Sequence, residues 1–543
     1  MAKTYEIHPA IGIARLGLSD KYFLAPEPDC TQAQFDQPGK IDSPARTAPP
    51  KKFRDQQKNL MRQAVRFRIF ECERDATGKL TAAREVYGGK IKSIAWTMHV
   101  ANRKGAAHNF GTSGWRNQRH TRRPKLVIDP KSRTLTGPRQ HAKFSNGTFL
   151  GRKVPLGDAK TDAAGRLIVL GGRGHSGYVS KSGKPKPLDD FANNDYWYDD
   201  TCDGPVTATV TLHDNTVHTA APAWVIVGPF DFAPEIDSFI SLYDVACKVA
   251  VERGWRALPQ PNETDFGRHV LPILARVRAY RWLSGEVMRA ETQDRHTAWR
   301  DILPQLRNPA DPKGIKFRQM LLAHIPDPDD PDDNAKAKRE VKMPRLHDDN
   351  DTPGKVLSLT RVQYRHLTNW ATGQFVDGTP ADKEFVCDAM DRIALEACSG
   401  GAFYPGMEAP RIMSDPSKYV ASCRLDPTKL KPGKVTEGLA VPWQADFFEC
   451  QADGDNAWWP ATRPDKVFAS VPTKPVDSQS EEMQRWDAGV NSMGSMVKRW
   501  HKLGIIRRKK VDAYVPGADK DAATQQAFVF IEQERLLPAR PKP

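Results

Sequence analysis

The side chains best suited to chemistry lie together near the C-terminal end of the chain. Asp446 stands four residues before Cys450, and residues four apart share one face of a helix. A carboxylate, a cysteine and a tryptophan are the side chains from which a protein can build its own redox cofactor. On composition alone, a structural cysteine beside an aromatic core or a sugar-binding wall is the simpler interpretation. The tryptophans of this region are Trp443, Trp458, Trp459, Trp486 and Trp500.

Other polar clusters do not match the common metal or phosphate motifs. A group of aspartates surrounds an aromatic segment but lacks the spacing and the glycine of an EF-hand, so we expect a solvated loop. A glycine-rich turn at residues 171–174 lacks the Lys-Ser/Thr of a phosphate loop. A group of histidines fits neither HExxH nor a two-histidine, one-carboxylate triad, so no metal site is expected. These groups are Asp195, Asp199, Asp200 and Asp203, and His99, His108, His120 and His141.

Length and composition indicate a large globular protein. The chain has 543 residues, of which 39% are apolar and 27% charged, enough for two to four domains or one elaborated domain. Its 81 Lys and Arg exceed its 66 Asp and Glu, giving a net charge of +15. Basic clusters at residues 116–125 and 499–510 are expected to be solvated faces, because no nucleic-acid-binding motif accompanies them.

Cysteine usage and hydropathy bear on the compartment. The eight cysteines form no C-x-x-C pair, which argues against a zinc site and a disulfide framework and favours a reducing compartment. The first residues contain no apolar signal-peptide core, and no run of 18 apolar residues occurs. We therefore expect a cytoplasmic location without a membrane span, with non-classical export left open.

Periodicity predicts an α+β fold with a β-rich N-terminal half and a more helical C-terminal half that carries the cofactor. We divide the chain into a β-rich region (1–235), a helical insertion with an exposed charged loop (236–355) and a cofactor-bearing catalytic region (356–543). Alternating or continuous apolar residues predict strands at 64–72, 91–100, 126–129, 166–170, 206–212 and 223–227. Helical spacing predicts helices at 237–253, 266–290, 314–324, 362–372 and 382–398.

Several longer sequence blocks carry a resemblance to a known family. They run in order along nearly the whole chain, and they include HPAIGIARLG at 8–17, TDAAGRLIVLGGRG at 161–174, AWVIVGPFDFAP at 223–234, ALEACSGGAFYPGMEAPRI at 394–412 and VPWQADFFEC at 441–450. With these blocks the chain resembles the L-lysine 6-oxidase and glycine oxidase (LodA-like) family of amino-acid oxidases.

The resemblance implies a cysteine tryptophylquinone, in which a tryptophan ring gains two oxygens and is joined to a cysteine sulfur. In that family an acid four residues before the cysteine is needed for the modification, and Asp446 and Cys450 match this spacing. Trp500 lies in the matching W-x-x-L-G context and is our choice for the ring. Trp486 is the second choice, and the WWP pair at 458–460 is less suited because it has the form of a structural wedge.

The implied reaction oxidises a primary amine of an amino acid, lysine-like or other, with O2. Its products are an aldehyde or keto compound, ammonia and hydrogen peroxide. The candidate base is Asp446, unless its role is confined to forming the cofactor, and His501 beside Trp500 is a further candidate. Phe403 and Tyr404 either line the substrate pocket or merely pack.

The family resemblance also implies partners. A flavoprotein that helps to install the oxygens is expected, as is a homo-oligomer, and neither a membrane nor a nucleic acid is expected as a partner. Two alternatives remain open. One is the same cofactor acting on a peptide-bound or carrier-bound amine, and the other is a non-catalytic binding protein whose site is not matured.

Overall fold

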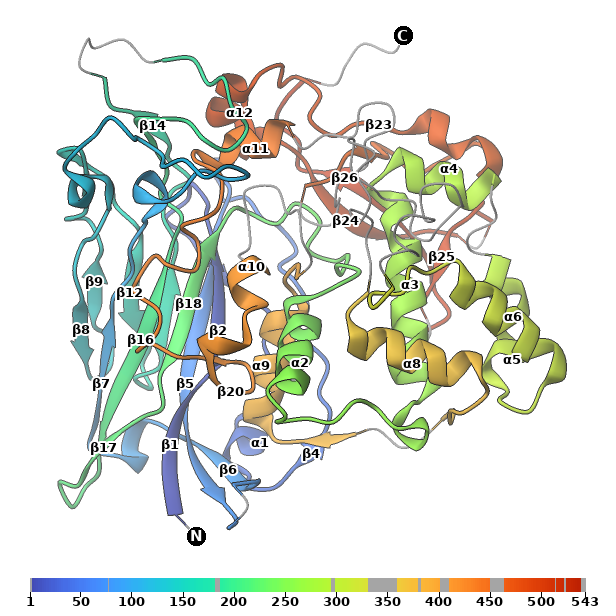
Figure 1. Ribbon diagram of the computed structural model, residues 1–543, viewed down its shortest axis with the longest axis horizontal. Coiled ribbons are helices and arrows are strands. Elements are labelled where there is room, and N and C mark those ends of the chain that lie inside the picture. The colour runs from blue at the N-terminus through green and yellow to red at the C-terminus, as the bar shows by residue number, and fades with distance from the viewer. Residues whose placement is uncertain are drawn as a thin grey trace.

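The computed structural model describes residues 2–76, 78–180, 186–293, 298–330, 359–378, 382–400, 410–449, 463–512, 514–521 and 524–538. Its main feature is a 13-stranded sheet built by the N-terminal part of the chain (Figure 1). The strands of this sheet are β1 (Ala2–His8), β2 (Ile11–Arg15), β3 (Tyr22–Leu24), β5 (Arg62–Arg74), β6 (Leu80–Val86), β7 (Ser93–Met98), β8 (Arg133–Thr136), β9 (His141–Lys143), β12 (Asp158–Thr161), β13 (Leu167–Leu170), β16 (Cys202–Thr211), β17 (Val217–Thr219) and β18 (Ala223–Gly228).

The central strands are buried because apolar side chains occupy both of their faces. β18 has the sequence AWVIVG with every residue buried, and it pairs in parallel with β2, placing Gly228 opposite Arg15. β16 alternates buried and half-buried positions, as a strand with one covered face does. The order β7-β16-β18-β2-β5-β13 follows from these pairings.

Helices, a three-stranded sheet and several two-stranded sheets form the rest of the described structure (Figure 1). Helix α9 packs against β2, and α2 packs against α9. β26 lies between β24 and β25 in a three-stranded sheet. These elements are α2 (Leu242–Glu252), α3 (Leu271–Ala279), α4 (Gly285–Gln293), α5 (Leu303–Arg307), α6 (Pro312–Ala323), α8 (Arg361–Ala371), α9 (Val386–Glu396), α10 (Pro410–Met413), β24 (Ile505–Lys510), β25 (Asp519–Lys520) and β26 (Ala527–Gln533).

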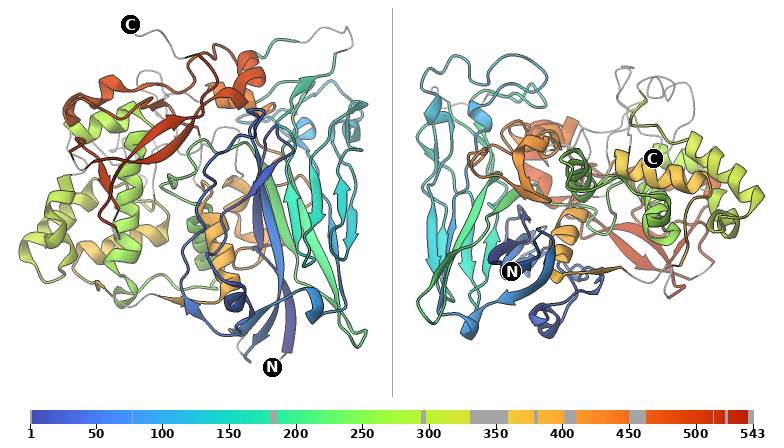
Figure 2. Two further views of the ribbon diagram at one scale, coloured as in Figure 1. Left: turned by 180° about the vertical axis from the view of Figure 1, so that it is seen from behind. Right: turned by 60° about the horizontal axis from the view of Figure 1, so that its bottom comes forward.

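One edge of the large sheet gathers segments that are distant in sequence. β2, β13 and β18 run in the same direction and end at this edge, and β16, antiparallel to β18, begins there. Helices α11 (Trp443–Glu449) and α12 (Met493–Arg499) contact each other and lie at this end of the molecule, opposite the N-terminus (Figures 1 and 2).

The α+β prediction, with a β-rich N-terminal half, is confirmed, but several details differ. Residues 126–129 form no strand: a 3-10 helix, η3 (Arg123–Leu126), is followed by an isolated bridge. The helix predicted over 266–290 is split into a π-helix η5 (Phe266–Val270), α3, a 3-10 helix η6 (Tyr280–Trp282) and α4. Helical periodicity continues through such irregular turns, so the apolar pattern does not reveal the breaks.

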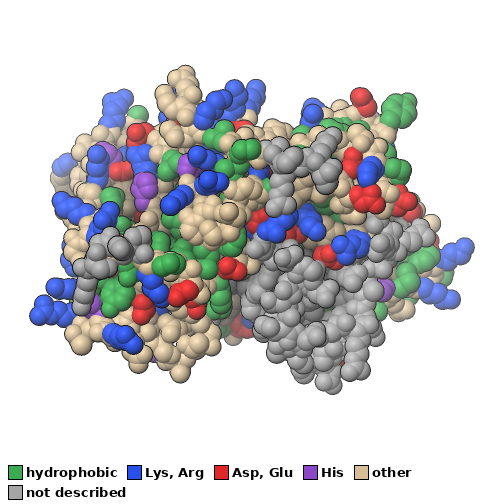
Figure 3. Space-filling model, turned by 90° about the horizontal axis from the view of Figure 1, so that it is seen from above, with side chains coloured by type: hydrophobic (Ala, Val, Ile, Leu, Met, Phe, Trp, Pro, Cys, Tyr) green, Lys and Arg blue, Asp and Glu red, His purple; other side chains and the backbone are tan. Residues whose placement is uncertain are grey.

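Two surface predictions are corrected. Asp199, Asp200 and Asp203 are almost fully buried rather than part of a solvated loop, and Arg116 in the first basic cluster is buried too. The face that carries α11 and α12 shows Lys and Arg scattered among other side chains rather than gathered in one stripe (Figure 3). Among the described residues, no helix is both long and apolar enough to span a membrane.

Candidate functional site

Two tryptophan rings meet where α11 and α12 pack together. Trp443 begins α11, and Trp500 directly follows α12. Their ring centroids lie 5.2 Å apart at an interplanar angle of 74°, the edge-to-face arrangement that aromatic pairs prefer. Both rings are buried, with Trp500 only 1% exposed.

The glycine-rich turn after β13 contacts the Trp500 ring from another direction. A Cβ added to Gly174 would lie 2.1 Å from Cζ2 of Trp500, so only a glycine allows this approach of backbone to ring. Gly174 also has a φ of +71°, which glycine adopts without strain. Gln444 of α11 donates from Nε2 to the Gly174 carbonyl at 3.1 Å and thereby fixes the turn to the helix.

A buried lysine and aspartate hold the first turn of α11. Asp199 Oδ2 accepts the backbone N–H of Trp443 at 3.0 Å and lies 2.9 Å from Lys104 Nζ. Lys104 also donates to the carbonyl of Ala440 at 3.0 Å. Burial lowers the pKa of Lys104, and the charge of Asp199 opposes this shift. The pair therefore anchors the chain on both sides of Pro442.

Asp200, the next residue, lies beneath the glycine-rich turn. Its Oδ2 accepts the backbone N–H of His175 at 3.1 Å, and its Oδ1 is buried without a hydrogen-bond partner. Burial, together with the charge of Asp199, raises the pKa of Asp200 to about 7, against hydrogen bonds from backbone N–H groups. A carboxyl group of this kind changes its protonation near neutral pH.

The predicted site residues are only partly within the described chain. Asp446 is buried on α11, and its charge acts on Lys104. α11 ends at Glu449, the residue before Cys450. Outside the described residues lie Cys450, Phe403, Tyr404, Trp458 and Trp459. The assignment of Cys450, Trp500 and Asp446 stays a prediction.

The alternative ring, Trp486, is also buried but lies in another position. It packs against Phe447 of α11 and Phe232, with centroid distances of 5.9 and 4.8 Å. Its Nε1 donates to the carbonyl of Gly504 at 2.8 Å, as expected of a satisfied core tryptophan. Trp486 therefore supports the helix that Trp500 contacts.

His501 lies beside Trp500, with ring centroids 5.9 Å apart. Burial, together with the charges of Arg54, Lys502 and His175, lowers the pKa of His501 to about 4. Arg54 donates to the carbonyl oxygens of His501 at 2.7 Å and Leu503 at 2.9 Å, which fixes this segment. At neutral pH the imidazole is therefore uncharged.

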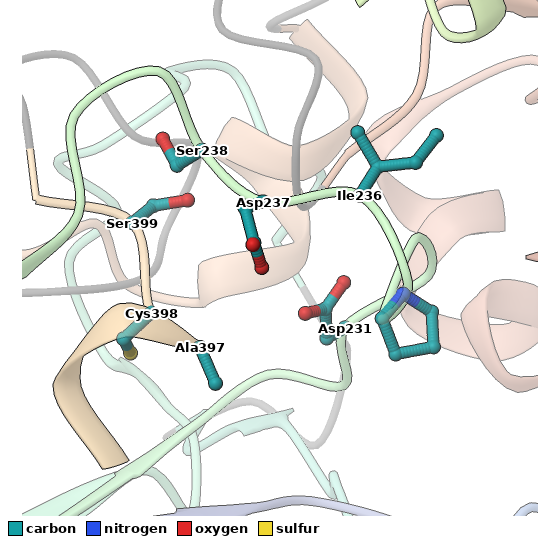
Figure 4. Close-up of a pocket in the computed structure, with 8 residues that line it drawn as sticks. Asp231, Ile236, Asp237, Ser238, Ala397, Cys398 and Ser399 are labelled. Carbon is teal, nitrogen blue, oxygen red and sulfur yellow. The ribbon is translucent and has the colours of Figure 1, made fainter. Parts of the chain in front are cut away.

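A small hollow lies between the loop that follows β18 and the end of α9. The carboxylates of Asp231 and Asp237 extend into the same opening (Figure 4). Asp237 pairs with Arg46 at 2.5 Å, and Arg15 donates from Nη2 to the Cys398 sulfur at 3.4 Å.

The hollow and the tryptophan pair are linked by packed aromatic rings. Phe232, next to Asp231, lies 5.9 Å from Phe447, and Phe447 lies 5.2 Å from Trp443. These two ring contacts connect the loop that lines the hollow with the tryptophan pair. Within the described residues, no group of three or more His, Cys, Asp or Glu could hold a metal ion.

Sequence reasoning missed Lys104 and misjudged two residues that it had noted. Asp199 and Asp200 were placed in a solvated loop, and the glycine-rich turn was recognised only as lacking a phosphate motif. Two sequence features could have pointed to the aspartates and the glycine-rich turn: the acidic and aromatic residues at 195–203, and the unusual density of glycine at 171–174.

Comparisons with known proteins agree on one family. The family model described as L-Lysine epsilon oxidase N-terminal matches residues 8–227, and that of the L-lysine epsilon oxidase C-terminal domain matches residues 341–470. L-lysine 6-oxidase from Marinomonas mediterranea is 28% identical over 535 residues, covering 82% of this chain and 71% of that protein.

The fold is also similar to solved structures. A crystal structure of the L-Lys epsilon-oxidase from Marinomonas mediterranea superposes with a TM-score of 0.75 at 23% identity, covering 98% of this chain and 95% of the other. The crystal structure of the Schiff base intermediate of that oxidase with L-Lys gives the same values. This likeness establishes the shared fold.

Proposed function

Because the chain belongs to the L-lysine epsilon-oxidase family and is an amino-acid oxidase, we propose that it oxidises a primary amine of a free, lysine-like amino acid through a cysteine tryptophylquinone formed from Cys450 and Trp500. The observation that carries this proposal is the position of Trp500. Its ring is buried between Trp443 and Gly174, beside the helix whose next residue is Cys450.

The residues around Trp500 suit such a group. The indole N–H of Trp443 is buried without a partner, and a neighbouring ring that bears oxygen would suit this donor. Asp446 lies on α11, four residues before Cys450 in the sequence. The tight contact with Gly174 restrains the ring, as a site of covalent modification requires.

When formed, the quinone would supply a two-electron acceptor for the C–H bond next to the amine, which no ordinary side chain provides. The chain's own residues would manage protons and water. Asp446 and His501 are the candidate bases, and the lowered pKa of His501 makes it a weaker proton acceptor than an ordinary imidazole. The buried aromatic rings around Trp500 would exclude water from a cofactor formed there.

The +15 net charge of the chain gives no guidance on the substrate, because local charge decides binding. Asp231 and Asp237 line the hollow, and both carboxylates interact with other described residues.

The test is to coexpress the chain with its flavoprotein maturation partner and to measure its intact mass and visible spectrum. We expect a mass gain from two oxygens, an absorption band and a crosslinked Cys450–Trp500 peptide. Amino acids and amines would then be screened for hydrogen peroxide release.

Two variants sharpen this test. Cys450→Ser is expected to remove the crosslink, whereas Trp486→Phe is expected to retain it. A crosslink to Trp486 would contradict the ring assignment. An unmodified, colourless protein would favour the non-catalytic alternative, and peroxide release only with peptide-bound amines would favour the other. Sedimentation of the same sample would test the proposed homo-oligomer.

A further inference from the structure

We propose that the consecutive residues Asp199 and Asp200 position the two sides of the Trp500 ring, and that Asp200 is the proton-holding group of the pair. This inference rests on the proposed function for its catalytic meaning. Its structural basis does not depend on the cofactor. Asp199 and Asp200 each bond to a segment that packs against the Trp500 ring.

Two groups support the Trp500 ring. Trp443 contacts Trp500 from α11, and Gly174 contacts it from the turn after β13. Trp443 begins a short helix, and Gly174 lies in a turn. Each of them is held by one aspartate.

Asp199 holds the helix and Asp200 holds the turn. Asp199 Oδ2 accepts the backbone N–H of Trp443 at 3.0 Å. Asp200 Oδ2 accepts the N–H of His175, directly after Gly174, at 3.1 Å. A Cβ at Gly172 would lie 2.4 Å from this same Oδ2, so the turn closes directly onto the carboxyl group.

The two aspartates differ in how their charge is compensated. Asp199 is paired with Lys104 and also accepts hydrogen bonds from Asn102 and Thr201. Asp200 has no ion pair in the described structure, and its Oδ1 is buried without a donor. A proton on Oδ1 would remove the charge from this buried group.

The surroundings of Asp200 contain few other titratable groups. Its charge is influenced by Asp199, and the backbone N–H groups of Arg173 and His175 bond to it. Cys202 lies within range of its charge. A charged carboxylate accepts a stronger hydrogen bond than a neutral carboxyl does. Protonation of Asp200 would therefore loosen its bond to the turn and alter the packing of Gly174 on Trp500.

The experiment uses protein made without the maturation partner and labelled with 5-fluorotryptophan. The Trp500 fluorine resonance is assigned by its loss in Trp500→Phe, and it is followed from about pH 5.5 to about pH 8.5, a range that brackets neutral pH. We expect the resonance to shift with a midpoint near 7. Asp200→Asn should abolish this transition.

Three further variants define the origin of the transition. The carboxyl group of Asp203 is equally buried, and both of its oxygens accept hydrogen bonds. Asp203→Asn should therefore leave the transition in place. His175→Gln should also leave it, because only the backbone of His175 contacts Asp200. Gly172→Ala should displace its midpoint, and it provides a second test should Asp200→Asn not fold.

A flat Trp500 resonance in the unaltered chain, or a transition that persists in Asp200→Asn or disappears in His175→Gln, would overturn the proposal. The readout needs no quinone, so a failure of the oxidase proposal would leave it unaffected. In matured enzyme, the rate-against-pH profile of Asp200→Asn should lack the step near 7 while the absorption band is retained.

Discussion

At the scale of single residues, Gly174 combines two constraints that a larger residue would violate. Gly174→Ala would force a methyl group against Trp500 at a positive φ. We expect a loss of about 2–4 kcal/mol in the free energy of unfolding, from overpacking and backbone strain together. Urea denaturation measures this loss.

The matched control for Gly174 is Gly137→Ala. Gly137 has a φ of +81° but open space around its Cα, so only the backbone term applies. We expect about 1 kcal/mol for this control. Equal losses in the two variants would show that the contact with Trp500 does not constrain the ring.

Lys104 stabilises the fold by neutralising the buried carboxylate of Asp199. Lys104→Met would leave Asp199 buried and unpaired, and we expect a loss of about 3–5 kcal/mol in unfolding free energy. The double variant Lys104→Met with Asp199→Asn should recover part of this loss, because no charge then remains uncompensated. Thermal denaturation of both proteins makes the comparison, and a double variant no more stable than the single one would refute the explanation.

At the scale of elements, Phe447 provides much of the aromatic packing that holds α11 in the core. Phe447 is fully buried and contacts Trp443, Trp486 and Phe232. Phe447→Ala should lower the unfolding free energy by about 3–5 kcal/mol. The neighbouring Phe448 is only partly buried, and Phe448→Ala should have a clearly smaller effect in the same denaturation experiment.

Another element contact predicts acid sensitivity. His366 on α8 stacks on His269 of η5, with centroids 4.2 Å apart, and burial with the charge of His269 lowers the pKa of His366 to about 3. Below about pH 6.5 the unfolded chain binds a proton that the folded chain does not. Stability should therefore fall between about pH 6.5 and 3, by up to about 1.4 kcal/mol per pH unit for this group.

The variant His366→Asn tests this acid sensitivity. An asparagine retains a polar group near Thr264, which lies 3.0 Å from His366 Nδ1, but it does not titrate. Unfolding free energy measured against pH should show a shallower acid slope in the variant. An unchanged slope would assign the sensitivity to other groups.

At the scale of the whole molecule, His8 joins the sheet to the helical part. Its pKa shift predicts a loss of stability at alkaline pH, opposite to the acid sensitivity expected from His366. Nδ1 of His8 lies 3.0 Å from Asp391 of α9, 383 residues away in the sequence. Burial lowers the pKa of His8, but Asp391 and Glu6 outweigh burial and raise it to about 10. This stabilisation is complete below about pH 6.5 and is lost as the pH rises towards 10.

We therefore expect maximum stability near neutral pH, with the alkaline decline reduced in His8→Gln. The measurement is the free energy of unfolding between about pH 7 and about pH 10, with His213→Gln as the control because His213 is exposed. If the free energy of unfolding declined equally in His8→Gln and His213→Gln, His8 would not be the cause of the alkaline decline.

The sequence by itself determined the local features of this protein. Strand and helix periodicity placed most of β5, β13, β16, β18, α6 and α8, because side-chain alternation depends only on nearby residues. The order of the sequence blocks indicated the family, and the Asp-x-x-x-Cys spacing indicated the cofactor hypothesis.

Only the tertiary structure decided which distant residues meet. Trp443 and Asp199 are 244 residues apart along the chain, yet a hydrogen bond joins them. The aspartates at 199–203 were expected to be exposed to solvent, because the sequence shows their charge but does not show that they are buried. Burial, the partner of a charge and the close approach of Gly174 to Trp500 depend on how parallel strands end at a common edge, and no local pattern encodes that arrangement.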